Sequence, residues 1–217
     1  MTSSIDKLQS LGHVIVIDDD VSVRRSLCTM LERAGYTVIL YDSADAFLSH
    51  PQTPLPAVIL LDMRMPGTTG IGLQPQLKTL ARNVPVVFVS GDSRPEEIIA
   101  AMKQGAVDFL LKPFTAQAMM DVIHRAMRLS YEAVVEDGKN SQISERLKKL
   151  TPRELEVCHW MVRGYSNQQI ATLDGGAPAT IKLHRARVMD KMGAQSLPEL
   201  IDMLIGIELP QPQRQSN

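Results

Sequence analysis

Four short apolar runs, each followed at once by charged or hydroxyl side chains, constrain the fold of this chain more than any other feature. The runs cover residues 14–17, 58–61, 86–89 and 108–111, and the side chains that follow are Asp18, Asp19 and Asp20, then Asp62, Ser90 and Lys112. The runs do not alternate with polar residues, which is typical of strands buried on both faces of a parallel sheet. Because ligands bind beyond the carboxyl ends of such strands, we expect these side chains to converge on a divalent cation and a phosphoryl group.

Helix and strand patterns alternate from residue 12 to about residue 130. A further strand is indicated at residues 37–41, and helical patterns follow the strands near residues 23–34, 43–48, 71–80, 94–104 and 115–129. Five βα units joined by right-handed crossovers predict an α/β sandwich of three layers.

Length, apolar content and net charge limit the class of protein and the compartment in which it is expected to act. The 217 residues suffice for one large domain or two small ones. No apolar run approaches the roughly 20 residues that span a bilayer, and the first residues lack the apolar core of a signal peptide. We therefore expect a cytoplasmic protein without a membrane partner. The net charge of −1 means that any contact with nucleic acid must come from a local basic patch.

The acidic side chains after the first run point to metal and phosphoryl chemistry. Asp18 and Asp19 repel one another and need a compensating cation if both are ionised. Mg²⁺ takes one or two carboxylates together with waters and phosphate oxygens, and Asp62 would complete the protein's share. Asp62 is also a candidate nucleophile, because carboxylates form acyl phosphates. Asp20 fits a helix N-cap on the surface better than a ligand.

Residues 12–129 resemble the receiver domain of bacterial two-component response regulators. The resemblance rests on residues 17–20, 61–67, 89–91 and 112–114, taken in this order. It implies a flavodoxin-like (βα)5 domain with strand order 2-1-3-4-5.

The resemblance also implies the roles of the side chains that handle phosphate. Asp62 would accept a phosphoryl group from a sensor histidine kinase, and Lys112 would bond a phosphoryl oxygen. Ser90 would swing toward the phosphoryl group, and Phe109 would change rotamer behind it. Beyond its own phosphorylation and dephosphorylation, such a domain is not an enzyme.

The metal site follows from the same resemblance. Asp19 and Asp62 would ligate Mg²⁺ (or Mn²⁺) directly, together with the backbone carbonyl of Arg64. Asp18 would act through a bound water.

Residues 131–149 are interpreted as an interdomain linker that is partly helical. Residues 131–136 extend the preceding helical pattern, whereas residues 137–140 (DGKN) should break it. We therefore divide the chain into a receiver at 12–130, this linker, a second domain at 150–209 and a disordered Pro/Gln-rich tail at 210–217.

The second domain is predicted to be a small all-α bundle of four helices. Thr151 fits an N-cap, and Glu154 completes a capping box. Ser166 and Gln169 form a second capping box, and further helices are indicated near residues 178–192 and 197–205. Short helices joined by tight turns favour a helix-turn-helix bundle.

Residues 150–205 resemble the LuxR/FixJ (NarL-like) helix-turn-helix, through residues 150–157, 164–171 and 180–186. The helical spacing turns Ile181, His184, Val188 and Met192 toward the bundle. The resemblance implies binding to double-stranded promoter DNA and dimerisation on phosphorylation. The residues expected to contact DNA are Thr180, Lys182, Leu183, Arg185, Ala186 and Arg187.

The turn at residues 174–179 departs from the family pattern. Asp174 and Gly176 stand where aliphatic side chains are expected, and Ala177 stands where a Ser or Thr cap is expected. Losing such a cap costs about 1 kcal/mol, so we expect either a looser turn or a recognition helix that becomes ordered only on binding, and weaker DNA binding in either case.

Two alternatives to a transcription regulator stay open. The departure at residues 174–179 allows a receiver-controlled regulator that binds protein instead of DNA. A Mg²⁺-dependent phosphatase of the haloacid-dehalogenase type would also use an aspartyl nucleophile and a lysine. Such enzymes carry a second acid two positions after the nucleophile, where this chain has Arg64.

Overall fold

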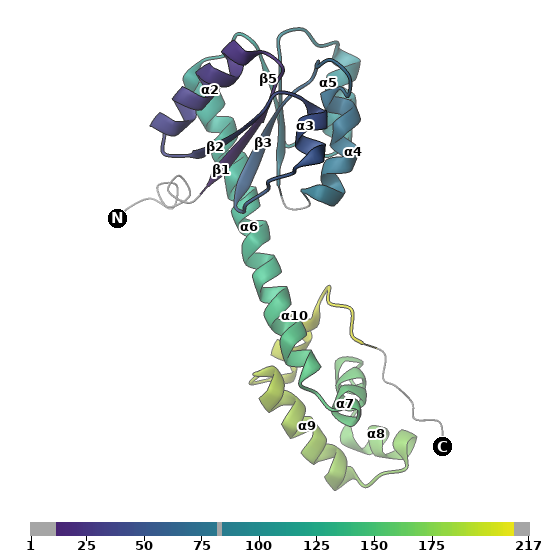
Figure 1. The fold of residues 1–217 in the computed structure, drawn as a ribbon. Coiled ribbons are helices and arrows are strands. Elements are labelled where there is room, and N and C mark those ends of the chain that lie inside the picture. The colour runs from purple at the N-terminus through teal and green to yellow at the C-terminus, as the bar shows by residue number, and fades with distance from the viewer. Residues whose placement is uncertain (1–11, 82–83, 211–217) are drawn as a thin grey trace. The chain divides into compact units, whose positions relative to one another are not determined.

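The computed structural model describes residues 12–81 and 84–210, and its first unit is a five-stranded parallel sheet with helices on both faces (Figure 1). The strand order is β2-β1-β3-β4-β5, as predicted. The strands are β1 (His13–Ile17), β2 (Thr37–Tyr41), β3 (Ala57–Asp62), β4 (Val86–Ser90) and β5 (Asp108–Leu111). The helices of this unit are α2 (Val21–Arg33), α3 (Ala44–Ser49), α4 (Gly70–Leu80), α5 (Pro95–Lys103) and the first part of α6 (Ala116–Lys148).

Alternate side chains of each central strand enter two separate apolar cores. Ile15 and Ile59 pack in the core beneath α3, α4 and α5, whereas Val14 and Val58 pack in the core beneath α2 and α6. Successive side chains of a strand point to opposite faces, so a sheet covered on both sides needs apolar residues at every position. This explains the uninterrupted apolar runs of the sequence.

The carboxyl ends of four strands meet at one edge of the sheet. The register pairs Ile17 with Leu61 and Ser90 with Leu111, so the residues that follow or end these strands lie near one another. Gly70, the first residue of α4, approaches this edge closely. A Cβ atom there would lie 2.2 Å from the carbonyl oxygen of Asp62, so only glycine lets α4 begin against the end of β3.

Helix α6 corrects one prediction. The break expected at residues 137–140 is absent, and α6 continues to Lys148. A glycine inside a helix costs about 1 kcal/mol relative to alanine but does not end the helix when packing holds both sides. Met127 is anchored in the core of the first unit, and Leu147 is buried in the core of the second. The boundary between the two compact units lies inside α6, between Val135 and Glu136.

The second unit is the predicted small helical bundle. Its helices are the last turns of α6, then α7 (Pro152–Val162), α8 (Asn167–Asp174), α9 (Pro178–Met192) and α10 (Leu197–Leu204). Both predicted capping boxes are present: Thr151 N donates to Glu154 Oε2 at 2.9 Å, and Ser166 N donates to Gln169 Oε1 at 2.8 Å. Of the tail predicted to be disordered, residues 211–217 lie outside the described residues.

Gly138→Ala tests the continuity of α6. A Cβ at Gly138 meets no atom within 4 Å, and alanine is the better helix former. We expect the substitution to raise the free energy of unfolding by about 0.5–1 kcal/mol. Denaturant unfolding followed by circular dichroism measures this change. Gly105→Ala is the control and should destabilise the protein, because Gly105 has a φ of +96°. A loss of stability in Gly138→Ala would contradict a helical conformation at this residue.

Candidate functional site

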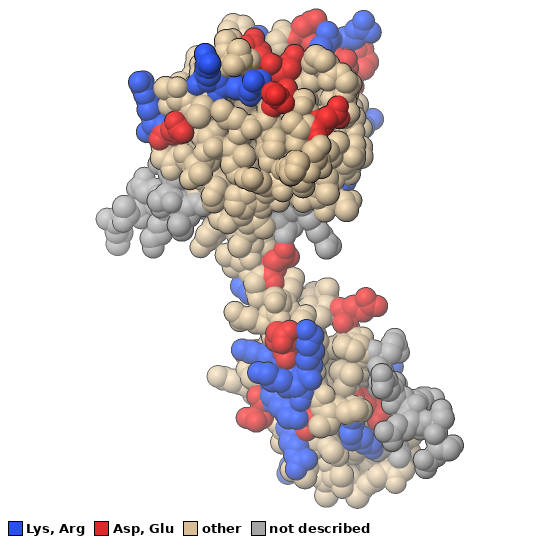
Figure 2. Space-filling view, in the orientation of Figure 1, with Lys and Arg blue, Asp and Glu red and all other residues tan. Residues whose placement is uncertain are grey.

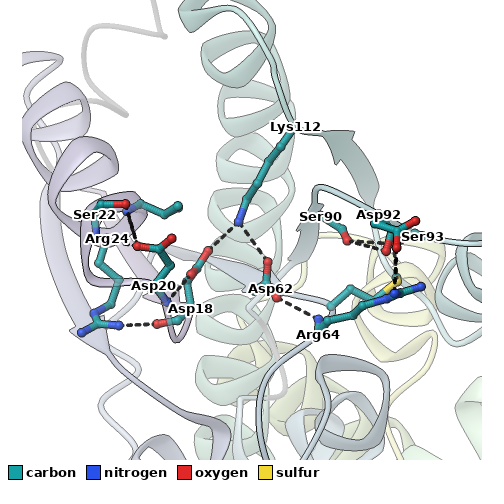
Figure 3. A network of polar contacts seen from close by, with 12 residues as sticks. Asp18, Asp20, Ser22, Arg24, Asp62, Arg64, Ser90, Asp92, Ser93 and Lys112 are labelled. Carbon is teal, nitrogen blue, oxygen red and sulfur yellow. Dashed lines mark hydrogen bonds and ion pairs between the residues drawn. The ribbon is translucent and has the colours of Figure 1, made fainter.

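Lys112 lies between two carboxylates at the carboxyl edge of the sheet (Figure 3). Its Nζ donates to Asp18 Oδ2 at 2.8 Å and to Asp62 Oδ1 at 3.0 Å. The side chains of Asp18 and Asp62 are only 4% and 9% exposed. The ends of β1, β3 and β5 therefore bring together three of the side chains that the sequence predicted to converge.

The charge at this site is unbalanced, because one ammonium group faces two buried carboxylates. Burial raises the pKa of Asp62 and the negative charge of Asp18 raises it further, while the hydrogen bond from Lys112 opposes both. Burial disfavours the charged form of Lys112, but the hydrogen bonds to Asp18 and Asp62 outweigh this and raise the pKa of Lys112. Asp19, directly after Asp18, is exposed and adds a further negative charge. The pocket thus has an excess of negative charge and several carboxylate oxygen atoms.

Backbone groups hold both buried carboxylates in place. Asp20 N donates to Asp18 Oδ1 at 2.9 Å, and Arg64 N donates to Asp62 Oδ2 at 2.8 Å. The side chain of Asp20 points elsewhere: its Oδ1 accepts from Ser22 N at 2.7 Å and caps α2. Hydrogen bonds from Ser22 lower the pKa of Asp20. Asp20 is therefore a surface N-cap, as predicted.

Ser90 and Phe109, which the sequence predicted to act as a switch, lie on the neighbouring strands β4 and β5. Ser90 is buried at the end of β4, and its Oγ lies 2.8 Å from Ser93 Oγ and 3.4 Å from the carbonyl oxygen of Asp92. These partners hold the Ser90 hydroxyl on the side away from Lys112 (Figure 3). Phe109 is paired in register with Phe88 and packs against the core beneath α5.

The predicted metal ligands are not assembled into a cluster. In the described ranges 12–81 and 84–210, no three His, Cys, Asp or Glu side chains are placed to hold a metal ion together. The donors present still fit a hard cation, because carboxylates and a backbone carbonyl supply only oxygen. Mg²⁺ sites use few protein ligands and complete their shell with waters and phosphate oxygens.

The side chain of Arg64 makes contacts that the sequence did not reveal. Its Nη1 lies 3.0 Å from Asp92 Oδ2, and its Nη2 lies 3.3 Å from Glu97 Oε2. The pair joins the loop after β3 to the start of α5. No pattern in the sequence links Arg64 to Glu97, which lies 33 positions further along the chain.

Helix α9 presents the face that was predicted to contact DNA. Ile181, Val188 and Met192 are buried in the bundle and His184 is partly buried. The exposed side chains of the helix include those of Thr180, Lys182, Leu183, Ala186 and Arg187. Figure 2 shows Lys and Arg side chains gathered on the face of the second unit where α9 is seen.

Two of the four basic residues of α9 are engaged inside the unit. Arg185 Nη1 donates to the carbonyl oxygen of Tyr165 at 2.9 Å, and burial lowers the pKa of Arg185. Lys191 pairs with Glu154 and donates to the carbonyl oxygen of Lys149 at 3.1 Å. Arg185, which the sequence assigned to DNA, therefore braces α9 against the turn before α8.

The turn before α9 shows the missing cap that the sequence predicted. Ala177 is the N-cap of α9 and makes no side-chain hydrogen bond to the first turn. Gly175, with a φ of 72°, ends α8 in the left-handed conformation.

Comparison with protein-family models identifies both units. Residues 14–124 match the response regulator receiver domain, and residues 148–204 match the bacterial regulatory proteins of the luxR family. The chain belongs to the response regulators. It is a DNA-binding regulator with a receiver domain and a LuxR-type helix-turn-helix domain.

Relatives and solved structures agree with this assignment over nearly the whole chain. This regulator is 38% identical to the transcriptional regulatory protein FixJ of Bradyrhizobium diazoefficiens, over 88% of the chain and 93% of that protein. It is 32% identical to the response regulator protein TodT of Pseudomonas putida, over 87% of the chain and 83% of that protein. The structure of the response regulator StyR matches with a TM-score of 0.76 and 38% identity, over 89% of this chain and 98% of that one. Full-length FixJ from B. japonicum matches with a TM-score of 0.54 and 37% identity, over 89% of this chain and 96% of that one.

Among the residues that the structure describes, no helix combines the length and the apolar character that crossing a membrane requires.

The raised pKa of Asp62 predicts a pH-dependent gain of stability in Asp62→Asn. The folded protein holds the proton of Asp62 more tightly than the unfolded chain does, so this group's contribution to the free energy of unfolding falls as the pH rises from the ordinary pKa of 3.8 through the folded pKa. We expect Asp62→Asn in metal-free buffer to melt at a higher temperature than the unsubstituted protein near pH 7, with the difference shrinking toward about pH 3.

Thermal unfolding at several pH values measures this difference. Glu97→Gln is the control of opposite sign, because hydrogen bonds from Arg94 and Arg64 lower the pKa of Glu97 despite some desolvation. Its carboxylate stabilises the fold above pH 4.5 and loses that effect as the pH falls, so Glu97→Gln should melt lower near pH 7. A melting temperature of Asp62→Asn below that of the unsubstituted protein near neutral pH would contradict the assigned electrostatics.

Proposed function

We propose that this regulator stores a phosphoryl group on Asp62, donated by a sensor histidine kinase, and that phosphorylation controls its binding to promoter DNA. The observation that supports this most directly is the position of Lys112 Nζ, 3.0 Å from Asp62 Oδ1 and 2.8 Å from Asp18 Oδ2. An Asp62 oxygen attacks phosphorus while the bond from phosphorus to the kinase histidine breaks. Lys112 stays beside the new acyl phosphate and neutralises charge on a phosphoryl oxygen.

The metal belongs to the same proposal. Asp19, Asp62 and the carbonyl of Arg64 would hold Mg²⁺ or Mn²⁺, and Asp18 would act through a water. Support comes from the excess of carboxylates over ammonium groups at this edge and from the all-oxygen donor set. When bound, the metal supplies positive charge to the phosphoryl oxygens during transfer.

Ser90 and Phe109 carry the signal away from Asp62 in this proposal. The Ser90 hydroxyl leaves Ser93 and bonds the phosphoryl group, and Phe109 moves into the space behind it. Phosphorylation thereby shifts an existing equilibrium between two arrangements. The phosphorylated form dimerises, and two α9 helices then read paired half-sites.

The DNA surface is proposed to consist of the exposed side chains of α9. Lys182 and Arg187 hold phosphates, while Thr180, Leu183 and Ala186 face the bases. Arg185 contributes by fixing α9 rather than by reaching the groove. A DNA-binding regulator of this kind acts in the cytoplasm, beside its promoters.

Residue 64 does not support a phosphatase of the haloacid-dehalogenase type, which would carry a second acid at this position. Residue 64 is an arginine whose side chain is engaged by Asp92 and Glu97, so no second acid stands two residues after Asp62. We propose accordingly that the only chemistry of this chain is its own phosphorylation and dephosphorylation.

Labelling with acetyl phosphate tests the phosphoacceptor. In the presence of Mg²⁺ we expect one phosphoryl group per chain, sensitive to hydroxylamine, and none in Asp62→Asn because the nucleophilic oxygen is lost. Intact-protein mass spectrometry measures the added phosphoryl group. Asp121→Asn, an exposed carboxylate on α6, is the matched control and should be labelled normally. Labelling that persists in Asp62→Asn would refute the assigned nucleophile.

Salt-dependent DNA binding tests the assignment on α9. With a duplex selected from a random library by the phosphorylated protein, we expect Lys182→Ala and Arg187→Ala each to weaken binding and to lower the slope of log affinity against log salt by about 1. Fluorescence anisotropy measures both quantities. Lys139→Ala, an exposed lysine on α6, should leave the slope unchanged. Failure of either phosphorylation state to enrich any sequence would favour the protein-binding alternative.

A further inference from the structure

The hydroxyl group of Ser93 has two acceptors within reach and a single proton to donate. Its Oγ lies 2.8 Å from Ser90 Oγ and 3.1 Å from Met63 Sδ. A serine hydroxyl donates one hydrogen bond, so Ser93 serves only one of these atoms at a time. Because a thioether sulfur is a weak acceptor, the proton goes to Ser90 while Ser90 stays in its present place.

The hydrogen bond from Ser93 is the shorter of the two contacts that hold the Ser90 hydroxyl. The other joins Ser90 Oγ to the carbonyl oxygen of Asp92 over 3.4 Å, a long distance for two oxygen atoms. Ser90 is only 2% exposed, so the loss of a partner there is not made good by bulk water. Ser93 therefore supplies most of the hold that keeps Ser90 on the side away from Lys112 (Figure 3).

The second acceptor belongs to the residue directly after the proposed phosphoacceptor. Met63 follows Asp62 at the end of β3 and is 1% exposed. If Ser90 turns toward Asp62, the Ser93 hydroxyl still has Met63 Sδ as a partner. A hydroxyl that exchanges one acceptor for another avoids the cost of an unsatisfied donor, so both positions of Ser90 leave Ser93 bonded.

The backbone around Ser93 is fixed while its hydroxyl is free to rotate. Arg64 contacts Asp92 at 3.0 Å and Glu97 at 3.3 Å, on either side of Ser93 in the chain. Glu97 Oε2 also accepts from Arg94 N at 2.8 Å. Because both acceptors already lie within hydrogen-bond distance of Ser93 Oγ, exchanging them needs only a rotation of the O–H bond.

We propose that Ser93 is a positioning residue of the switch: it holds Ser90 away from Asp62 and turns to Met63 when Ser90 leaves. This role rests on the proposed function, in which Ser90 bonds the phosphoryl group on Asp62. The strength of the hold sets how much of the binding free energy of a phosphoryl group is spent on moving Ser90. Ser93 thereby tunes the equilibrium between the two arrangements without touching the phosphoryl group itself.

Isothermal titration of the full chain with beryllium trifluoride, a mimic of the phosphoryl group, tests this role in the presence of Mg²⁺. We expect Ser93→Ala to bind the mimic about threefold more tightly than the unsubstituted chain, because the hydrogen bond that holds Ser90 is lost. Ser141→Ala, an exposed serine on α6, is the matched control and should bind as the unsubstituted chain does.

A double-mutant cycle separates the hold on Ser90 from a general change of the loop. In the Ser90→Ala background there is no hydroxyl to hold, so adding Ser93→Ala should leave the affinity for the mimic unchanged. A disturbed loop would alter the affinity whether or not Ser90 is present. The coupling between the two substitutions therefore measures the proposed role.

Met63→Leu tests the second acceptor and should have the opposite sign. The substitution conserves the volume of this buried side chain but removes the sulfur. The bond from Ser93 to Ser90 is kept, whereas Ser93 loses its partner once Ser90 has moved. We expect the mimic to bind about twofold more weakly, and Met63→Leu to have no effect in the Ser93→Ala background.

The outcomes distinguish a failure of this role from a failure of the proposed function. Absence of binding to the unsubstituted chain, or equal binding to Asp62→Asn, would overturn the chemistry at Asp62 and the role of Ser93 with it. If binding requires Asp62, an unchanged affinity in Ser93→Ala would overturn the role of Ser93 alone. So would a gain of the same size with and without the Ser90 hydroxyl. An unchanged affinity in Met63→Leu would overturn the exchange of acceptors.

Discussion

The ammonium group of Lys112 is the contact on which the receiver site depends. It bonds Asp18 and Asp62, two carboxylates that are almost completely buried. A buried carboxylate without a partner is strongly unfavourable, so removing Lys112 would leave both carboxylates uncompensated. Because one cation serves two anions, the pocket keeps a negative charge, which favours the binding of a cation.

The sheet fixes the positions of the two carboxylates that Lys112 contacts. β1 and β3 are neighbours at the point where the strand order reverses, so Asp18 and Asp62 extend from adjacent strands. Gly70 lets α4 begin directly behind Asp62, and Arg64 ties the loop after β3 to α5 through Asp92 and Glu97. These contacts place the start of α4 and the loop that is tied to α5 next to Asp62. The hydroxyl of Ser90 is bonded to Ser93 and not to Asp62.

The second unit begins earlier in the chain than its helix-turn-helix pattern suggests. Leu147 is buried in its core, and Arg146 Nη1 donates to the carbonyl oxygen of Met192 at 2.7 Å, at the end of α9. The last turns of α6 are therefore part of the structure that positions α9. The same unit uses Arg185 and Lys191 for internal contacts, which leaves Lys182 and Arg187 as the exposed cations of α9.

The sequence by itself determined the features that depend on neighbouring residues. Uninterrupted apolar runs predicted the buried strands, Asp20 and Thr151 were identified as caps, and the spacing of Ile181 and Val188 assigned the faces of α9. Such patterns report backbone hydrogen bonding and side-chain direction, which act over a few residues. Only the tertiary structure decided that Lys112 bonds both Asp18 and Asp62, that Arg185 turns inward and that α6 continues through Gly138. Each of these three features depends either on distances between segments far apart in the chain or on packing strong enough to overcome a local preference. Neither the distances nor the packing can be read from the order of the residues.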